Sequence, residues 1–267
     1  MNSSLDAALS LQNLEVIFSD ASGVVHALND LSFELSPNEF VCLIGPSGSG
    51  KSTILRVIAG LVDPTSGKVK FNDHQSHVGL VFQKANLMPW RRVIENVKLP
   101  LELEDLPDEI IQSRAQELID LVGLSGFENA YPHDLSGGMA QRVAIARSLI
   151  QDPDLLLLDE PFGSLDALTR ERMGDELLHI WQARRKTVLM VTHSISEAIY
   201  LSDRVLVLSS RPGQIKQVLN VGLPRPRTPE MRYLPEFSTL AHQLRDCLSE
   251  EQICPPKMSS PSDRSSS

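Results

Sequence analysis

One stretch, "FVCLIGPSGSGKSTILRVIAGL" at residues 40–61, sets the architecture of this chain of 267 residues. It begins with an apolar run, passes through the glycine-rich segment Gly45–Ser52, and ends with apolar residues at helical spacing. The segment matches G-x-x-x-x-G-K-[ST] at every fixed position, and the order strand, loop, helix is the context that this motif requires. We therefore predict a phosphate loop here, with a plain glycine-rich turn as the alternative.

The phosphate loop predicts how a nucleotide is held. Its backbone N–H groups can surround the β-phosphate, Lys51 can bridge the β- and γ-phosphates, and the Ser52 hydroxyl can ligate Mg²⁺. The binding residues expected from the motif and the residue after it are Gly45, Pro46, Ser47, Gly48, Ser49, Gly50, Lys51, Ser52 and Thr53.

Three further apolar runs each end in a polar residue, as the first one ends in the phosphate loop. They are "VGLVFQ" ending at Gln83, "LLLLDE" ending at Asp159 and Glu160, and "TVLMVTH" ending at His193. Runs that are apolar at every position are typical of strands buried on both faces of a parallel sheet. Ligands collect beyond the carboxyl ends of such strands, so all four segments are expected to deliver polar groups to one edge.

The polar residues at that edge have the chemistry of phosphoryl transfer. Asp159 can anchor the Mg²⁺ shell, and Glu160, held extended by the following proline, can polarise the attacking water as general base. His193 can hydrogen-bond the γ-phosphate, and the Gln83 amide oxygen can meet Mg²⁺ or the water. The alternatives are two surface acids at a strand end, a histidine that caps a helix or is satisfied by local contacts, and a glutamine without a role.

The rest of the chain surrounds this core with other patterns. "LQNLEVIF", "HALNDLSFEL" and "KVKFN" alternate partially and predict a small antiparallel sheet, and "QIKQVLNVGL" predicts a last hairpin. Residues 89–150 are mostly helical in pattern, with one helix expected in "LPDEIIQSRAQELIDLVGL". The fold class is therefore α/β: a P-loop NTPase core with a mostly parallel sheet, a small N-terminal antiparallel β subdomain and an inserted helical subdomain.

Bulk composition limits the classes of partner. A formal net charge of −9 argues against nucleic acid, which requires a basic surface. Cys42, Cys247 and Cys254 are neither even in number nor spaced as a metal site, so reduced thiols are expected. Neither a secretory signal nor an apolar run of membrane-spanning length is evident, which predicts folding in the cytosol with membrane association only through a partner.

A second glycine-rich segment, "LSGGMAQR" at Leu135–Arg142, also looks like a phosphate-binding helix start, because Ser136 can cap the helix and two glycines follow. With "GPSGSGKS", "LVFQ", "LSGGMAQR", "LLLLDEP", "GSLDALT" and "VTH" in this order, the chain resembles the ATP-binding subunit of an ABC transporter over about residues 11–222. We call Leu135–Arg142 the signature segment.

The resemblance assigns roles to individual residues. It implies that the nucleotide is ATP, that Gly45–Ser52 are Walker A, that Leu155–Asp159 are Walker B, and that Glu160 is the catalytic glutamate. Gln83 resembles the Q-loop glutamine, Ser164–Asp166 the D-loop and His193 the switch histidine, while Ser136, Gly137 and Gly138 resemble the signature. Phe18 is the aromatic expected to stack on adenine, with a core phenylalanine in an edge strand as the alternative. The expected catalytic residues are Glu160, His193 and Lys51; the metal ligands are Ser52, Gln83 and Asp159; Asp166 joins the nucleotide-binding set.

The family also implies an assembly. Such subunits work as head-to-tail pairs, in which the signature segment of one faces the phosphate loop of the other, so a second ATP-binding subunit is an expected partner. The other partners are integral membrane permease subunits and, indirectly, a periplasmic or surface solute-binding protein. The expected location is the cytoplasmic face of the membrane, and the expected extent is 11–222 for the ATP-binding domain and 223–267 for a C-terminal extension with a disordered end.

Smaller features narrow the resemblance. "NLMPWRRVIENV", "YPHDLSGGMAQR", "DEPFGSLDALTR" and "LPRPR" together look like the nitrate, sulfonate and taurine importer group, which includes bicarbonate relatives. Trp90 can be a docking anchor for a permease, or a tryptophan packed in the helical subdomain. Two departures are a short segment before Gln83 and Ser194, which follows His193 where the family usually has Asp.

Two other functions compete with the importer subunit. One is a soluble ABC-type ATPase acting on nucleic acid or cofactor assembly, which the acidic balance and the single Walker A disfavour. The other is a regulatory role for residues after about 224, whose proline- and serine-rich composition is also that of a plain tail.

Overall fold

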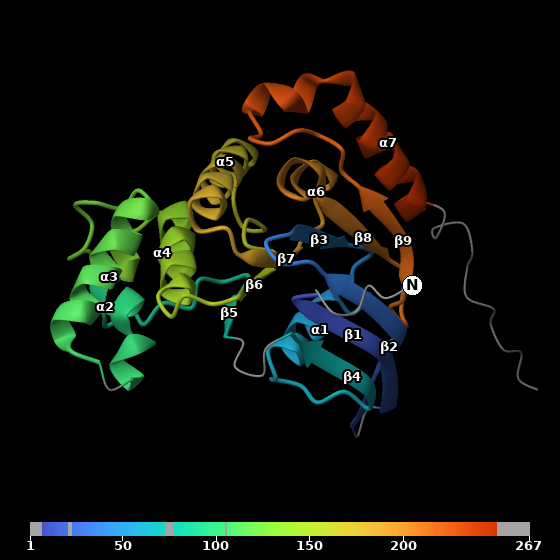
Figure 1. Cartoon of the computed structure of the whole chain (residues 1–267), viewed down its shortest axis with the longest axis horizontal. Coiled ribbons are helices and arrows are strands. Elements are labelled where there is room, and N and C mark those ends of the chain that lie inside the picture. The colour runs from blue at the N-terminus through green and yellow to red at the C-terminus, as the bar shows by residue number, and fades with distance from the viewer. Residues whose placement is uncertain (1–6, 21–22, 73–76, 105, 250–267) are drawn as a thin grey trace, which may run out of the picture.

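The central element of the fold is a six-stranded sheet, seen edge-on in the middle of the molecule (Figure 1). The computed structural model describes residues 7–20, 23–72, 77–104 and 106–249. In spatial order the strands are β5 (Val78–Val81), β6 (Leu155–Asp159), β7 (Thr187–Val191), β3 (Phe40–Ile44), β8 (Arg204–Leu208) and β9 (Ile215–Asn220). All neighbours are parallel except the hairpin of β8 and β9. The predicted parallel strands and the predicted hairpin are therefore confirmed.

The inner strands β3, β6 and β7 are almost uniformly apolar because both faces of the sheet are covered. In β3, Val41 and Leu43 belong to one hydrophobic core, whereas Phe40, Cys42 and Ile44 belong to another on the opposite face. The same alternation divides β6 between the two cores. The sequence pattern thus has its cause in a sheet that lies between two packed layers.

The first layer is a three-stranded antiparallel sheet together with α1 (Lys51–Ile58). Its strands are β1 (Leu9–Asp20), β2 (Gly23–Leu35) and β4 (Ser66–Phe71), in the order β2-β1-β4. Ile54 and Leu55 of α1 share one core with residues of both sheets, so the helix that follows the phosphate loop is held from both sides. The predicted small antiparallel sheet is confirmed.

The helical section forms a group of its own beyond β5 and β6 (green in Figure 1). It contains α2 (Val93–Lys98), α3 (Asp108–Leu121), α4 (Gly137–Leu149) and two short 3₁₀ turns at Leu101–Leu103 and Pro132–Asp134. The helix expected in residues 106–124 is confirmed as α3, whose Ile111, Ala115, Leu118 and Ile119 are buried. All three helices fall within the section 89–150.

The second layer covers the other face with α5 (Ala167–Arg184), α6 (Ile195–Leu201) and α7 (Pro235–Ser249), preceded by a 3₁₀ turn at Pro229–Tyr233 (Figure 1). The helix expected near 236–250 is confirmed as α7, which buries Phe237 and Leu244. The expectation of a disordered end concerns residues outside the described part of the chain, as does Cys254. Cys42 and Cys247 are free thiols, as expected.

The segment Leu223–Arg227, "LPRPR", fixes the C-terminal end of α6. The buried Arg227 guanidinium donates hydrogen bonds to the carbonyls of Tyr200 at 3.0 Å and Ser202 at 2.8 Å. Arg225 donates to the carbonyl of Leu201 at 2.8 Å. Carbonyls at a helix C-terminus lack partners within the helix, so two arginines satisfy groups that would otherwise be buried unpaired. The start of the C-terminal extension is therefore part of the packed domain.

Among the described residues, every helix is too short or too polar to cross a membrane.

Candidate functional site

A cavity of about 460 Å³ lies where the phosphate loop meets the carboxyl edge of the central sheet. Its walls include Gly45, Ser47, Gly48, Gly50, Lys51, Ser52, Thr53, Glu160 and His193. Its volume is in the usual range for a cofactor site. Residues from three sequence segments that we expected to meet at one edge therefore line one cavity.

The phosphate loop needs its glycines for close packing as well as for backbone conformation. Gly50 has φ 91°, and a Cβ there would lie 2.6 Å from Leu28 Cδ2 and 3.0 Å from the Ala27 carbonyl oxygen. Gly48 has φ 77° and also occupies the left-handed region. Only glycine enters this region without strain, so the loop can turn tightly and present its N–H groups to the cavity.

Lys51 is held by the loop that it closes. Its side chain is 7% exposed, and Nζ donates to the carbonyls of Gly45 at 2.9 Å and Pro46 at 2.8 Å. Burial lowers the pKa of Lys51, and the charges of Glu160 and Asp159 oppose that shift. The ammonium group thus donates only to neutral carbonyls. Anionic phosphate oxygens are stronger acceptors and can replace them.

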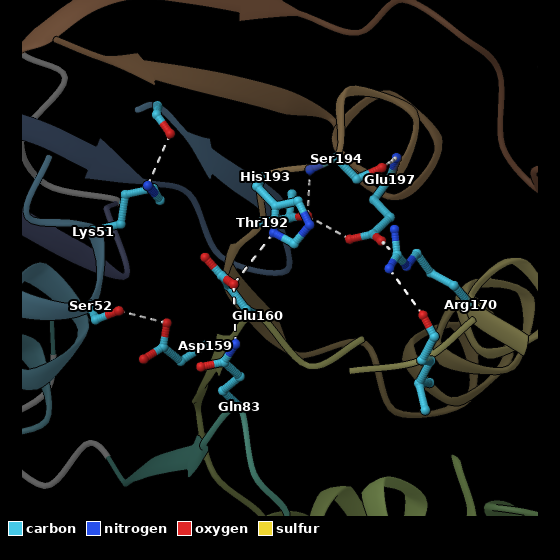
Figure 2. A network of polar contacts seen from close by, with 12 residues as sticks. Lys51, Ser52, Gln83, Asp159, Glu160, Arg170, Thr192, His193, Ser194 and Glu197 are labelled. Carbon is cyan, nitrogen blue, oxygen red and sulfur yellow. Dashed lines mark hydrogen bonds and ion pairs between the residues drawn. The ribbon is translucent and has the colours of Figure 1, made fainter. Parts of the chain in front are cut away.

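Ser52 and Asp159 supply two neighbouring oxygen atoms that could bind a metal ion. Ser52 Oγ donates to Asp159 Oδ1 at 2.9 Å, which joins the start of α1 to the end of β6 (Figure 2). Burial raises the pKa of Asp159, so a nearby cation would stabilise its charged form. In the described ranges no three His, Cys, Asp or Glu side chains gather as a metal cage. A hydroxyl and one carboxylate fit Mg²⁺, which keeps water and phosphate oxygens as its remaining ligands.

Glu160 has a strained backbone conformation at this edge. The expectation that the following proline holds it extended is wrong: Glu160 has φ 45°, in the left-handed region, where a non-glycine residue costs about 1–3 kcal/mol. Its N–H donates to the Val191 carbonyl at 3.0 Å, which fixes that conformation against β7. The carboxylate Oε2 is 3.3 Å from His193 Nδ1 and 3.4 Å from Gln83 Nε2 (Figure 2). The backbone therefore aims the carboxylate at two other predicted site residues.

His193 and Ser194 connect β7 to α6. The alternative of a helix-capping histidine is wrong, because the N-cap of α6 is Ser194, and His193 instead lines the cavity. Ser194 Oγ accepts a hydrogen bond from the Glu197 N–H at 3.3 Å. Serine thus serves as N-cap where the family usually has Asp.

Phe18 and three residues that the sequence did not predict complete the cavity. Phe18 pairs with Val25 across β1 and β2, is 43% exposed and lines the cavity, so the alternative of a core phenylalanine is wrong. Val25, Ala27 and Arg211 were missed. Arg211 Nε donates to the Gly48 carbonyl at 3.2 Å and adds a cation beside the loop. Its only sequence signal is the turn "RPG", which predicts a turn and no ligand.

The signature segment lies elsewhere. Ser136 is the N-cap of α4 as predicted, with its Oγ accepting from the Met139 N–H at 3.3 Å. Gly138 faces Thr169 and Met173 of α5. Among the described residues that line the cavity there is none from Ser136–Gly138, and Asp166 is absent too; its carboxylate caps α5 by accepting from the Thr169 N–H at 3.0 Å. The second glycine segment therefore adds nothing to the nucleotide cavity of its own chain.

Trp90 is exposed, so the alternative to a docking role, a tryptophan packed inside the helical group, is wrong. Its side chain is 72% accessible, in the loop between β5 and α2. An exposed tryptophan in the loop that follows Gln83 in sequence is available to a partner.

Comparison with known proteins gives a consistent result. The model of the "ABC transporter" family matches residues 28–163. The chain is 43% identical to an "Aliphatic sulfonates import ATP-binding protein" of Bacillus cereus over 225 residues, covering 82% of this chain and 88% of the relative. It is also 43% identical to a "Nitrate import ATP-binding protein" of Synechocystis sp. over 251 residues, covering 90% of this chain and 94% of the relative.

A solved structure agrees in fold. It is described as the dimeric structure of a post-hydrolysis state of an ATP-binding cassette bound to ADP and Pi. The TM-score is 0.70 with 33% sequence identity, over 81% of this chain and 100% of that one.

Proposed function

The chain belongs to the ABC transporter family as an ATP-binding subunit that hydrolyses ATP to drive transport, and we propose that it energises an importer of a small solute. The proposed solutes are nitrate, sulfonate, taurine or a related compound. Relatives named for sulfonate and for nitrate import are each 43% identical to this chain, so the similarity supports the group and favours neither solute.

The cavity carries the proposal, because it joins the phosphate loop to the Glu160 carboxylate and the His193 imidazole, with Asp159 bonded to Ser52 of its wall. Loop N–H groups and Lys51 hold the β- and γ-phosphates, with Ser47 and Thr53 lining the same wall. Arg211 adds charge near the phosphates, and Phe18 stacks on the adenine. Ser52 and Asp159, with Gln83, would hold Mg²⁺, which would supply positive charge beside the phosphates.

Hydrolysis follows from Glu160. Its carboxylate accepts a proton from the water that attacks the γ-phosphorus, and ADP leaves with the electrons of the broken P–O bond. His193 and Gln83 flank the same carboxylate oxygen at 3.3 and 3.4 Å and so orient both Glu160 and the water. The fixed backbone at Glu160 reduces the reorganisation that the reaction requires.

The remaining half of each site comes from a partner. Two subunits pair head to tail, and Ser136, Gly137, Gly138 and Asp166 of one enclose ATP held by Lys51 of the other. The support is the position of Ser136 outside its own cavity, and the solved dimer of a similar cassette. A γ-phosphate contacted from both sides favours the closed pair, and hydrolysis removes that preference.

Transport requires membrane subunits, and we propose that they dock near residues 84–105. Trp90 is the proposed anchor, since exposed aromatic side chains dominate many interfaces. The subunit then works at the cytoplasmic face of the membrane, and the solute-binding protein acts through the permease. We also propose the division into an ATP-binding domain at 11–222, with a helical subdomain at 89–150, and an extension at 223–267.

The decisive experiment is ATP-driven dimer formation. Glu160→Gln keeps the size of the side chain but removes the base, so with Mg²⁺ and ATP it should sediment as a dimer while ATP turnover falls about 100-fold or more. Glu109→Gln, an exposed acid on α3, is the matched control and should stay like wild type. A Glu160→Gln chain that binds ATP but stays monomeric would refute closure.

The competing function, a soluble ATPase acting on nucleic acid or cofactor assembly, has no specific support in the site. Co-purification distinguishes it: recovery with integral membrane proteins supports transport, and recovery with RNA or DNA contradicts it. Removing only residues 250–267, which follow α7, and comparing transport rates tests a regulatory role of the end of the extension, because α7 and the arginines that hold α6 stay in place.

A further inference from the structure

A polar chain runs from the His193 loop away from the phosphate loop, toward α5 (Figure 2). Thr192, next to His193, is buried, and its Oγ1 donates to Glu197 Oε2 at 2.5 Å. The same hydroxyl oxygen accepts a hydrogen bond from the Ser194 N–H at 3.0 Å. Both neighbours of His193 in sequence are therefore tied to α6 through one carboxylate.

Glu197 is a carboxylate in a mostly buried position. Its side chain is 13% exposed. Burial raises its pKa and the charge of Glu160 acts in the same direction, while Thr192, Arg170 and His193 lower it. A buried carboxylate is stable only with hydrogen bonds and an opposite charge, so Glu197 depends on Arg170.

Arg170, on α5, contacts two segments at once. Its Nε is 3.6 Å from Glu197 Oε1, and its terminal nitrogen donates to the Leu165 carbonyl at 3.0 Å (Figure 2). A planar guanidinium can hold a carboxylate and a carbonyl in fixed relative positions, which a lysine ammonium does less well. Arg170 thus joins the His193 loop to the backbone between Ser164 and Asp166.

The segment held by Arg170 begins at the catalytic edge and ends at the surface. The Gly163 N–H donates to the Glu160 carbonyl at 3.0 Å, which ties the start of the segment to the strained residue. At its end Asp166 is exposed and Leu168 is 72% accessible. Through this segment and the polar chain, the two groups next to the γ-phosphate are connected to one surface.

We propose that Arg170 and Glu197 are positioning residues that couple His193 and Glu160 to the Ser164–Asp166 segment, so that turnover at one nucleotide site depends on contact with the partner subunit. The inference rests on the proposed function, because it requires the head-to-tail pair. Neither side chain lines the nucleotide cavity, so the coupling acts on the rate of hydrolysis and leaves nucleotide binding by the single chain intact.

The test is a double-mutant cycle on the full chain with Arg170→Met, Glu197→Gln and the combination. ATP binding is measured by titration, and ATP hydrolysis is measured against ATP concentration. We expect an unchanged Kd for ATP, a KM within about twofold, and a kcat lowered about tenfold, since small displacements at a reacting centre have effects of this size. The double variant should lose no more than either single variant, because the two residues act as a unit.

Arg172→Met is the matched control, an exposed arginine on the same helix, and its effect should be negligible and additive with that of Glu197→Gln. Glu197→Gln keeps the size of the side chain and can still accept the hydrogen bond from Thr192. If Arg170→Met folds poorly, Glu197→Gln alone therefore tests the inference. Unchanged kcat in Glu197→Gln, additive losses in the double variant, or equal losses in Arg172→Met would each overturn the inference while wild type still hydrolyses ATP. Wild type without ATP-dependent dimers would instead contradict the proposed function.

Discussion

The two glycine-rich segments of this chain look alike in sequence and differ in their surroundings. Gly45–Ser52 is enclosed by its own chain: Gly50 packs against Leu28, and Lys51 is bonded to two loop carbonyls. The signature segment begins α4 in the helical group, and its Gly137 would place a Cβ no closer than 3.3 Å to any neighbour. The first segment is a cavity wall, whereas the start of the second, Ser136 and Gly137, is exposed.

This difference indicates that the chain contains two half-sites. A helix start with a serine cap and glycines is able to approach an anion, but an anion must be brought to it. In the proposed head-to-tail pair, the phosphate loop of the partner brings ATP to Ser136. Three predictions test this contrast, from the largest effect to the smallest.

Substituting one residue in each segment should separate binding from turnover. Lys51→Ala removes the cation that holds the phosphates, so ATP binding and hydrolysis should both fall, hydrolysis by about 100-fold or more. Ser136→Arg blocks the surface that contacts the partner, so hydrolysis should fall as much as in Lys51→Ala. ATP binding should be nearly unchanged. Nucleotide titration with a fluorescent ATP analogue and a phosphate-release assay measure the two properties. Equal loss of binding in Ser136→Arg would mean that the segment serves its own chain.

Mixing the two inactive variants should restore activity. In a mixed pair, the intact phosphate loop of the Ser136→Arg chain meets the intact signature of the Lys51→Ala chain. Random pairing puts about half of the pairs in the mixed form with one good site each, so at most roughly a quarter of wild-type hydrolysis should return. A value well below a quarter would measure how strongly the two sites depend on each other. No recovery at any mixing ratio would argue against composite sites.

Matched glycine substitutions should differ in their effect on stability. Gly50→Ala forces a Cβ into Leu28 at positive φ, so it should lower the free energy of unfolding by about 1–3 kcal/mol. Gly137→Ala meets only the flexible end of Leu165 and should stay within about 0.5 kcal/mol of wild type. Urea denaturation followed by circular dichroism measures both. Similar losses in the two variants would show that the signature segment is as tightly packed as the phosphate loop.

The prediction of the fold from sequence succeeded where local patterns have one physical reading. Uniformly apolar runs predicted β3, β5, β6 and β7, because only a sheet covered on both faces removes the polar alternation. The helical spacing of residues 106–124 predicted α3 for a similar reason. The motif at Gly45–Ser52 and the polar strand ends likewise predicted most of the cavity wall.

Side chains whose role depends on distant partners could not be predicted. Arg211 comes from the loop after β8, and its place beside Gly48 depends on the packing of β8 against β3. For Phe18 and Trp90 the sequence left burial open, because an aromatic residue fits a core and a surface equally well. The role of Arg227 could not be predicted either, because its acceptors are carbonyls at the end of α6, far from it in sequence.

The amino-acid sequence by itself determined the class of fold, the phosphate loop and the residue types of the catalytic edge, because each follows from local periodicity or from a short motif with one mechanism. Only the tertiary structure decided that Glu160 adopts a left-handed conformation 3.3 Å from His193, and that the signature segment lies outside the cavity. Both findings depend on contacts between residues far apart along the chain. Those contacts are set by how the sheet and its two layers pack.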